Sequence, residues 1–185
     1  MSTVPFLPSA RPRLTRELCL ARSPHVVDTQ VVTVIAFRGY YHQQESDNER
    51  GKYDDAVCIV GPDHYSTYNF NVDPSAFRDR IASLAAGEYR YKPGIHGLSK
   101  PRDRQYQAYV QNSKVTVKRD HAATETGYFG INIHRGSSSG TSSLGCQTVP
   151  PAQWDAFNHA LLDQLKRAGQ KDFRYLLIDQ PNPPS

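Results

Sequence analysis

One cysteine and one histidine in the last third of the chain have the types and spacing needed for nucleophilic chemistry. Cys146 lies in the segment SSLGCQ, and His134 lies twelve residues upstream at the end of an apolar run. A thiol becomes an effective nucleophile when an adjacent base takes its proton and backbone N–H groups face the developing oxyanion. Gly145 has no side chain and permits a positive φ, so the amides of Gly145 and Cys146 are the expected oxyanion donors.

The segment between these two residues suits such an arrangement. Residues 135–143 (RGSSSGTSS) are small and polar, so this loop can fold back and bring the imidazole beside the thiol. The imidazole would then lower the pKa of the thiol and carry its proton to the leaving group. The alternative stays open that Cys146 is a buried structural cysteine with a hydrogen-bonded histidine beside it.

Two other histidines are weighed as functional residues. His96, in the segment PGIHG, is either a cleft residue and second base or an ordinary loop histidine. His121 follows an aspartate and is expected on a surface turn. A zinc site built from His96, His121, His134 and Cys146 has suitable residue types. No compact ligand pair supports it, so we expect no metal, and a metal-dependent peptidase remains a rival class.

Hydrophobic periodicity predicts a mostly β domain with two helices. The helix at 151–168 places Trp154, Phe157, Leu161 and Leu165 on one stripe and ends at Gly169. The predicted strands cover residues 31–37, 56–60, 65–72, 88–92, 106–110, 114–118, 129–134, 144–149 and 173–178.

A second helix is predicted at residues 74–86. Asp73 is a natural N-cap, and Phe77, Ile81 and Leu84 fall on one helical face. The strands at 106–110 and 114–118 are predicted to form a β-hairpin across residues 111–113.

Composition narrows the class of protein. The 185 residues fit one domain, which we place at residues 26–179 between an N-terminal arm at 1–25 and a frayed tail at 180–185. The net charge of +4 is mild, and no basic run is dense enough to predict nucleic-acid binding. Three scattered cysteines do not form a disulfide framework.

The chain also lacks a predicted membrane or export segment. No stretch approaches the roughly 20 apolar residues of a membrane span. The first 24 residues hold four arginines and no apolar block, so no secretory signal peptide is expected. A protein of this kind would be made in the cytoplasm and reach a target outside it after release or delivery.

The sequence around His134 and Cys146 resembles the signature of a known protein family. GINIHRG at 130–136, followed by SLGCQ at 143–147, is similar to the motif of the YkuD-type L,D-transpeptidase family. A looser likeness extends over residues 54–179. The segments RGYY at 38–41, YDDA at 53–56 and SSLGCQT at 142–148 resemble a phage- and prophage-associated branch more closely.

This resemblance implies a YkuD-like β-sandwich that acts on peptidoglycan stem peptides through Cys146 and His134. It also implies substrate contacts around the nucleophile. The residues expected to make them are Ser143, Gln147, Thr148, Arg135 and His96.

The sequence departs from the family pattern at three points. Leu144 stands where a second histidine is usual, Thr148 replaces an arginine or asparagine, and the loop between histidine and cysteine is short. These changes imply a different acceptor, hydrolysis in place of transpeptidation, or lost activity. We therefore expect a cysteine-dependent stem-peptide hydrolase or transpeptidase that needs no cofactor, acting as a phage lysis enzyme or a delivered effector. A non-catalytic wall-binding or virion protein with the same fold is the alternative.

Overall fold

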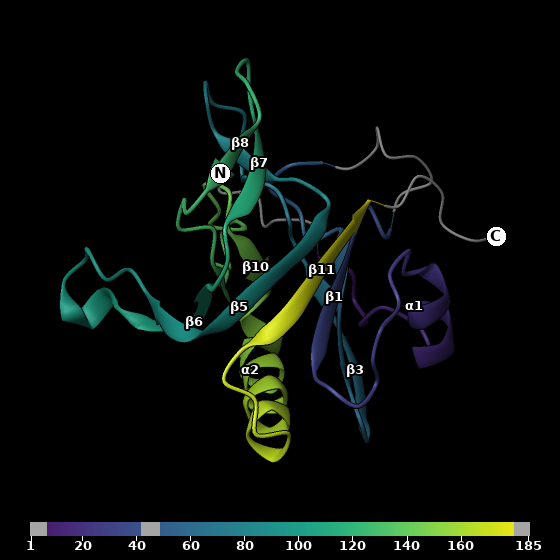
Figure 1. Ribbon diagram of the computed structural model, residues 1–185. Helices are drawn as coiled ribbons and strands as arrows, with labels where there is room; N and C mark the ends of the chain where they lie inside the picture. The colour runs from purple at the N-terminus through teal and green to yellow at the C-terminus, as the bar shows by residue number, and fades with distance from the viewer. Residues whose placement is uncertain (1–6, 42–48, 180–185) are drawn as a thin grey trace.

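The fold is mostly β, as predicted, and it contains two α-helices, of which only the one at 151–168 was predicted. The computed structural model describes residues 7–41 and 49–179, and these residues form two sheets (Figure 1). The larger sheet has eight strands in the order β10-β9-β6-β5-β11-β1-β2-β3, and the smaller has three in the order β4-β7-β8. The strands are β1 (Thr33–Arg38), β2 (Asp55–Gly61), β3 (His64–Phe70), β4 (Ala82–Leu84), β5 (Gly87–His96), β6 (Tyr106–Gln111), β7 (Val115–Arg119), β8 (Glu125–Gly127), β9 (Ile133–Arg135), β10 (Gln147–Val149) and β11 (Phe173–Asp179).

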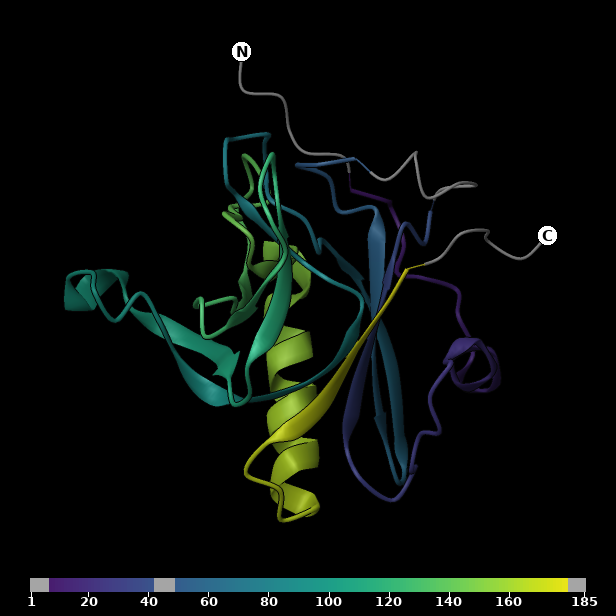
Figure 2. The ribbon, with the colours of Figure 1, turned by 45° about the horizontal axis from the view of Figure 1, so that its top comes forward.

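The centre of the large sheet is buried on both faces. In β1, Val34 and Ala36 face the main core, whereas Ile35 and Phe37 face a second, smaller core. Successive side chains of a strand point to opposite faces, so a strand covered on both sides is a continuous apolar run. The two helices supply this cover from opposite sides of the sheet (Figure 2).

Helix α2 (Pro151–Arg167) packs on the main core and confirms the helix predicted at 151–168. Its end is fixed by Gly169, which adopts φ 65°. The Gly169 N–H donates to Lys166 O (3.2 Å), and the Gln170 N–H donates to Leu165 O (2.9 Å). This pair of bonds is the Schellman motif, in which a left-handed glycine satisfies the last helical carbonyls.

The large sheet curls until its two ends nearly meet. Asn71, just after β3, bridges Thr148 of β10 through two backbone hydrogen bonds of 2.9 and 2.8 Å. Helix α2 contacts β2 and β3 at one end of the sheet and β9 and β10 at the other. The curled sheet therefore brings β9 and β10, which flank the predicted nucleophile, against a fixed helix.

The N-terminal arm is more ordered than the sequence indicates. Helix α1 (Arg16–Arg22) forms inside it, and Cys19 and Leu14 pack in the second core. Thr15 caps the helix by accepting the Leu18 N–H through its side chain. Within the described residues of the arm, Pro12 and Leu14 lie along β3, where the Tyr65 hydroxyl donates to Leu14 O at 2.7 Å.

The helix predicted at residues 74–86 was wrong. The expected N-cap, Asp73, lies 3.5 Å from the Arg38 guanidinium, and residues 82–84 pair with β7 as strand β4. Arg80 adopts φ 58°, which interrupts a right-handed helix, and Phe77 is 82% exposed. Long-range pairing therefore overrides a local helical pattern here.

The hairpin predicted across residues 111–113 was also wrong. β6 pairs with β5 and β9 in the large sheet, whereas β7 pairs with β4 and β8 in the small one. The side chain of Gln111 accepts the backbone N–H groups of Phe129 (3.0 Å) and Ile131 (2.9 Å). This glutamine therefore ties the strand to the segment that leads into β9.

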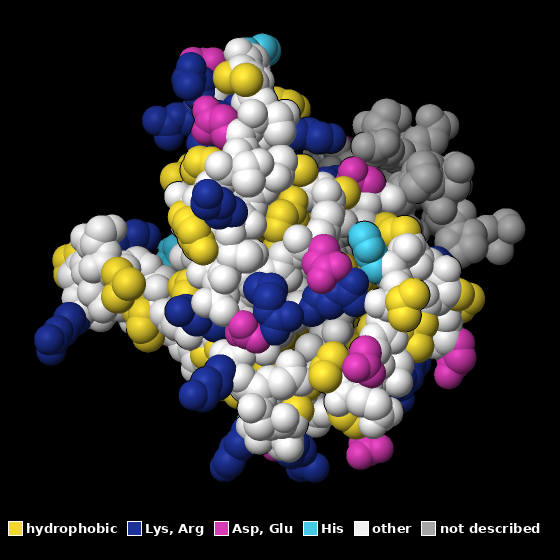
Figure 3. Space-filling view, viewed as in Figure 1, with side chains coloured by type: hydrophobic (Ala, Val, Ile, Leu, Met, Phe, Trp, Pro, Cys, Tyr) yellow, Lys and Arg dark blue, Asp and Glu magenta, His cyan; other side chains and the backbone are white. Residues whose placement is uncertain are grey.

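Charges of both signs intermingle on the face that displays β5 and β11 (Figure 3). Arg174 of β11 pairs with Glu88 of β5 at 2.6 Å, and Arg90 pairs with Asp172. Exposed ion pairs of this kind contribute little to stability, so the buried apolar contacts hold the fold together.

The contrast between Phe157 and Phe77 gives a test of the fold. Phe157 is fully buried under the sheet, so Phe157→Ala should lower the free energy of unfolding by about 3–5 kcal/mol. Phe77 is exposed and its ring lies under the Arg50 guanidinium, so Phe77→Ala should cost about 1 kcal/mol or less. Urea unfolding followed by circular dichroism measures both. Equal, large losses of unfolding free energy in the two variants would contradict the exposed position of Phe77 and support the helix predicted at 74–86.

Candidate active site

The parallel pairing of β9 with β10 places the two reactive residues together. Gln147 aligns with Ile133, and Thr148 aligns with His134. Cys146 directly precedes β10 and Asn132 directly precedes β9, so these two residues are neighbours. The Asn132 N–H faces the Cys146 sulfur at 3.4 Å, and the Gln147 N–H donates to Asn132 O at 2.8 Å.

A tight turn holds the cysteine in place. The Ser143 hydroxyl donates to Cys146 O (2.7 Å) and accepts the Gly145 N–H (3.0 Å). Gly145 adopts φ 122°, and a Cβ at this position would lie 2.5 Å from Ala82 O. Only glycine fits there.

This turn corrects the expected oxyanion site. The amide of Gly145 is already bonded to Ser143, which contradicts its predicted role as an oxyanion donor. The Cys146 amide keeps that role as a prediction. Gly145 therefore allows the turn to form and to pass close to the backbone of Ala82. This role does not involve a direct contact with substrate.

A serine from outside the loop fastens the other end of the turn. The Ser75 N–H donates to Ser143 O at 2.9 Å, and the Ser143 N–H donates to the Ser75 hydroxyl at 2.8 Å. The same hydroxyl bonds Thr141 at 2.7 Å. The serine- and glycine-rich loop is therefore held by specific hydrogen bonds.

His134 is buried, and contacts to its Nδ1 fix the orientation of the ring. Its Nδ1 lies 2.8 Å from Arg135 O and 3.0 Å from the Tyr106 hydroxyl. Because a carbonyl only accepts, Nδ1 carries the hydrogen and Nε2 is left as the basic nitrogen. Burial, reinforced by the neighbouring His96, lowers the pKa of His134 to about 4. The imidazole is therefore neutral near pH 7.

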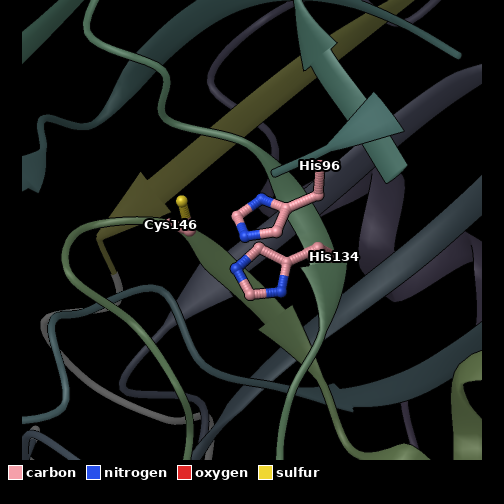
Figure 4. A group of neighbouring side chains, drawn as sticks. All are labelled: His96, His134 and Cys146. Carbon is pink, nitrogen blue, oxygen red and sulfur yellow. The ribbon is translucent and has the colours of Figure 1, made fainter. Parts of the chain in front are cut away.

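A second imidazole lies on top of the first. His96, at the end of β5, stacks on His134 with ring centroids 4.1 Å apart and planes 29° from parallel. The Asn132 side chain lies 3.2 Å from its Nδ1. The side-chain nitrogens of His96 and His134 and the sulfur of Cys146 all lie within 4.8 Å of one another. Figure 4 shows both rings reaching toward the cysteine.

The resting thiol is protonated. Burial raises the pKa of Cys146 above its ordinary value of 9.0, while the Asn132 N–H and the charge of Lys100 oppose this shift. A neutral thiol beside a neutral imidazole can transfer its proton at the moment of attack. It is not a preformed thiolate–imidazolium pair.

The three residues share an open cleft of about 850 Å³. One wall comes from the loop between β5 and β6, and another from the nucleophile turn, where Leu144 is 71% exposed. The cleft gives a peptide-sized ligand access to the sulfur, which is half-buried.

The structure separates the predicted substrate contacts into two groups. His96 and Ser143 line the cleft. Gln147 and Thr148 do not, and predicting them as substrate contacts was wrong, because both are fully buried. Gln147 instead bonds Val72 O (2.9 Å) and accepts the Tyr175 hydroxyl (2.9 Å).

Arg135 lies apart from the thiol. Its side chain is exposed, and the guanidinium sits 5.6 Å from the centre of the Tyr106 ring. It borders a separate, smaller hollow beside the serine loop. His121 occupies an exposed turn with φ 55° and is not in the histidine–cysteine group.

Sequence reasoning missed several residues that build the site. Asn132 supplies an amide to the sulfur, Tyr106 and Arg135 O orient His134, and Ser75 anchors the turn. Asn132 lies two residues before His134 in the GINIH segment, so the sequence could have predicted that it lies next to β9. Tyr106 and Ser75 are distant in sequence and carry no local signal.

Compared with protein-family models, curated proteins and solved structures, this chain matches none of them significantly. No helix in the described part of the chain is long and apolar enough to cross a bilayer.

Alkylation of Cys146 should follow the raised thiol pKa. Because the thiolate is the reacting form, the iodoacetamide rate should rise about tenfold per pH unit between pH about 7 and 9. Cys19 and Cys58 are buried, so peptide mass spectrometry can assign the label to Cys146. A rate that stays constant from pH about 5 to 8 would reveal a thiolate–imidazolium pair instead.

His134 should make the fold acid-sensitive. The unfolded chain takes up this proton near pH 6.5, but the folded chain does so only near 4. The free energy of unfolding should therefore fall by about 3 kcal/mol as pH drops across this window. Urea unfolding of His134→Asn should show a shallower pH dependence than wild type.

His121→Asn is the matched control for that experiment, because asparagine tolerates the left-handed backbone at this exposed turn. It should keep the wild-type pH dependence. Identical profiles for wild type and His134→Asn would contradict the lowered pKa.

Proposed function

We propose that this chain is a cysteine-dependent peptidoglycan stem-peptide hydrolase with a YkuD-like, L,D-transpeptidase-type domain. The observation that carries the proposal is the placement of the half-buried Cys146 thiol and the Nε2 side of His134 in one open cleft. The segments GINIHRG and SLGCQ, whose sequences resemble the family motif, carry His134 and Cys146.

The proposed reaction uses the neutral pair directly. The Cys146 sulfur attacks a stem-peptide carbonyl, forming an S–C bond, as His134 Nε2 takes the thiol proton. The Cys146 N–H stabilises the oxyanion. The C–N bond then breaks, and His134 returns the proton to the leaving amine. Water, deprotonated by His134, hydrolyses the thioester and frees the thiol.

Hydrolysis as L,D-carboxypeptidase or endopeptidase is proposed ahead of transpeptidation, which differs only in using an amine to resolve the thioester. Leu144 and Thr148 depart from the cross-linking family's pattern, and the exposed Leu144 side chain borders the cleft. The role fits a phage lysis enzyme or a delivered effector. A non-catalytic wall-binding or virion protein with the same fold is the alternative outcome.

One observation favours a second candidate, a zinc-dependent peptidase. His96, His134 and Cys146 offer three ligand atoms close together, which is the number of protein ligands in a catalytic zinc site. The carbonyl that accepts the His134 Nδ1–H is also a usual partner of a metal-bound histidine. Zinc there would activate a water molecule, and Cys146 would be a ligand.

The test is mass spectrometry of purified muropeptides incubated with the protein. Wild type should release products that have gained one water. Cys146→Ala should lose at least about 10³-fold in rate, and His134→Asn about 10²–10⁴-fold. His121→Asn should retain full activity. Full turnover by Cys146→Ala would remove the thiol from the mechanism.

Inhibitors then separate the two candidates. A thiol enzyme should be inactivated by iodoacetamide and keep its activity in a chelator. Loss of activity in the chelator, restored by added zinc, would establish the metal-dependent candidate instead. Tight muropeptide binding without any turnover would support the wall-binding alternative.

A further inference from the structure

We infer that His96 is a further catalytic residue, whose Nε2–H stabilises the oxyanion together with the Cys146 N–H. This inference rests on the proposed hydrolase function and adds a donor that the nucleophile turn lacks. Oxyanion holes combine backbone N–H groups with side-chain donors, histidine among them. The Gly145 N–H is already bonded to the Ser143 hydroxyl, so a second donor has to come from outside the turn.

His96 lies in the right place to be that donor. It ends β5 and lines the same cleft as Cys146. One of its ring nitrogens lies within 4.8 Å of the Cys146 sulfur, and its ring reaches toward the cysteine beside that of His134 (Figure 4). An oxyanion donor sits about 2.7–3.1 Å from the oxygen that it stabilises. A carbonyl group attacked by the sulfur therefore fits between the thiol and the His96 ring.

The side chain of Asn132 fixes which nitrogen of His96 carries the hydrogen. Its amide nitrogen lies 3.2 Å from His96 Nδ1. An amide NH₂ group donates and does not accept, so Nδ1 is the acceptor and the hydrogen of the neutral ring is on Nε2. Burial lowers the pKa of His96, and the charge of Lys100 adds to this shift, so the ring is neutral near pH 7.

The stacking of the two imidazoles directs this N–H into the cleft. The ring centroids of His96 and His134 are 4.1 Å apart, and the planes are 29° from parallel. The N–H bond of an imidazole lies in the plane of its ring, so the Nε2–H of His96 points past the stacked ring and not at it. Among the described residues, Asn132 is the hydrogen-bond partner of the His96 ring, which leaves the Nε2–H for substrate.

The two histidines therefore have opposite tautomers and different roles. His134 holds its hydrogen on Nδ1 against Arg135 O and keeps Nε2 basic. When the Cys146 sulfur bonds to the carbonyl carbon, the π electrons of the C=O bond move to oxygen and the thiol proton moves to His134 Nε2. His96 donates a hydrogen bond to that oxygen and neither gains nor loses a proton.

The tautomers can be measured without a substrate. Long-range ¹H–¹⁵N correlation spectra of ¹⁵N-labelled protein distinguish a protonated ring nitrogen from an unprotonated one. His96 should carry its hydrogen on Nε2 and His134 on Nδ1. Asn132→Asp replaces the donor by an acceptor and should place a hydrogen on His96 Nδ1. A wild-type His96 with its hydrogen on Nδ1 alone would overturn the inference.

Muropeptide turnover then compares two substitutions of the same residue. Glutamine places an amide nitrogen near the position of histidine Nε2, whereas asparagine places one near Nδ1. His96→Gln should therefore keep kcat within about tenfold of wild type, and His96→Asn should lower kcat about 10²–10³-fold with little change in KM. His121→Asn, at an exposed turn, is the control and should keep the wild-type kcat. Equal losses in the two His96 variants would contradict a donor role.

A peptide aldehyde tests the donor separately from hydrolysis. The Cys146 thiol adds across the aldehyde of acetyl-alaninal, forming an S–C bond and a hemithioacetal oxygen with no leaving group. The dissociation constant, followed by NMR of ¹³C-labelled aldehyde, should rise about tenfold in His96→Asn and little in His96→Gln. An unchanged dissociation constant in His96→Asn would overturn the role of His96 and leave the hydrolase intact. Absence of muropeptide turnover by wild type would count against the hydrolase, and the aldehyde then decides His96 alone.

Discussion

The parallel pairing of β9 with β10 is the constraint on which the site depends. It sets Asn132 beside Cys146, so one backbone amide reaches the sulfur while the next hydrogen bond, from Gln147 to Asn132 O, fixes the register. A shift by one residue would turn His134 to the other face of the sheet. The buried Gln147 side chain, bonded to Val72 and Tyr175, secures this register from below.

Burial around the reactive pair favours neutral groups. The pKa of the thiol is raised and that of His134 is lowered to about 4, so each shift opposes charge separation before substrate binds. The oriented Nδ1–H of His134 and the Asn132 amide would instead stabilise charge as it develops during the reaction. The same neutral, closely spaced donors also suit a metal ion, which is why the zinc candidate shares this site.

A histidine from a distant strand completes the group of reactive side chains. Leu144, in the turn before Cys146, is exposed and contributes no imidazole. His96 of β5 stacks on His134 from the opposite side. The loop that follows His96 also carries Lys100, so β5 and its extension form the wall of the cleft that faces the nucleophile turn.

The sequence by itself determined the elements with strong local patterns and indicated that His134 and Cys146 lie together. The stripe of Trp154, Phe157, Leu161 and Leu165 was enough for helix α2, and continuous apolar runs were enough for β1 and β2. The loop of serines and glycines correctly indicated a return of Cys146 toward His134. These features depend on neighbours within a few residues of one another.

Only the tertiary structure decided which distant segments meet. It turned residues 82–84 into a strand by pairing them with β7, sent β6 and β7 into different sheets, and buried Gln147 and Thr148. It also brought His96 to the thiol and Ser75 to the turn that holds Cys146. A local pattern specifies which face of a strand is apolar but not its partner, because pairing is settled by burial of the whole sheet.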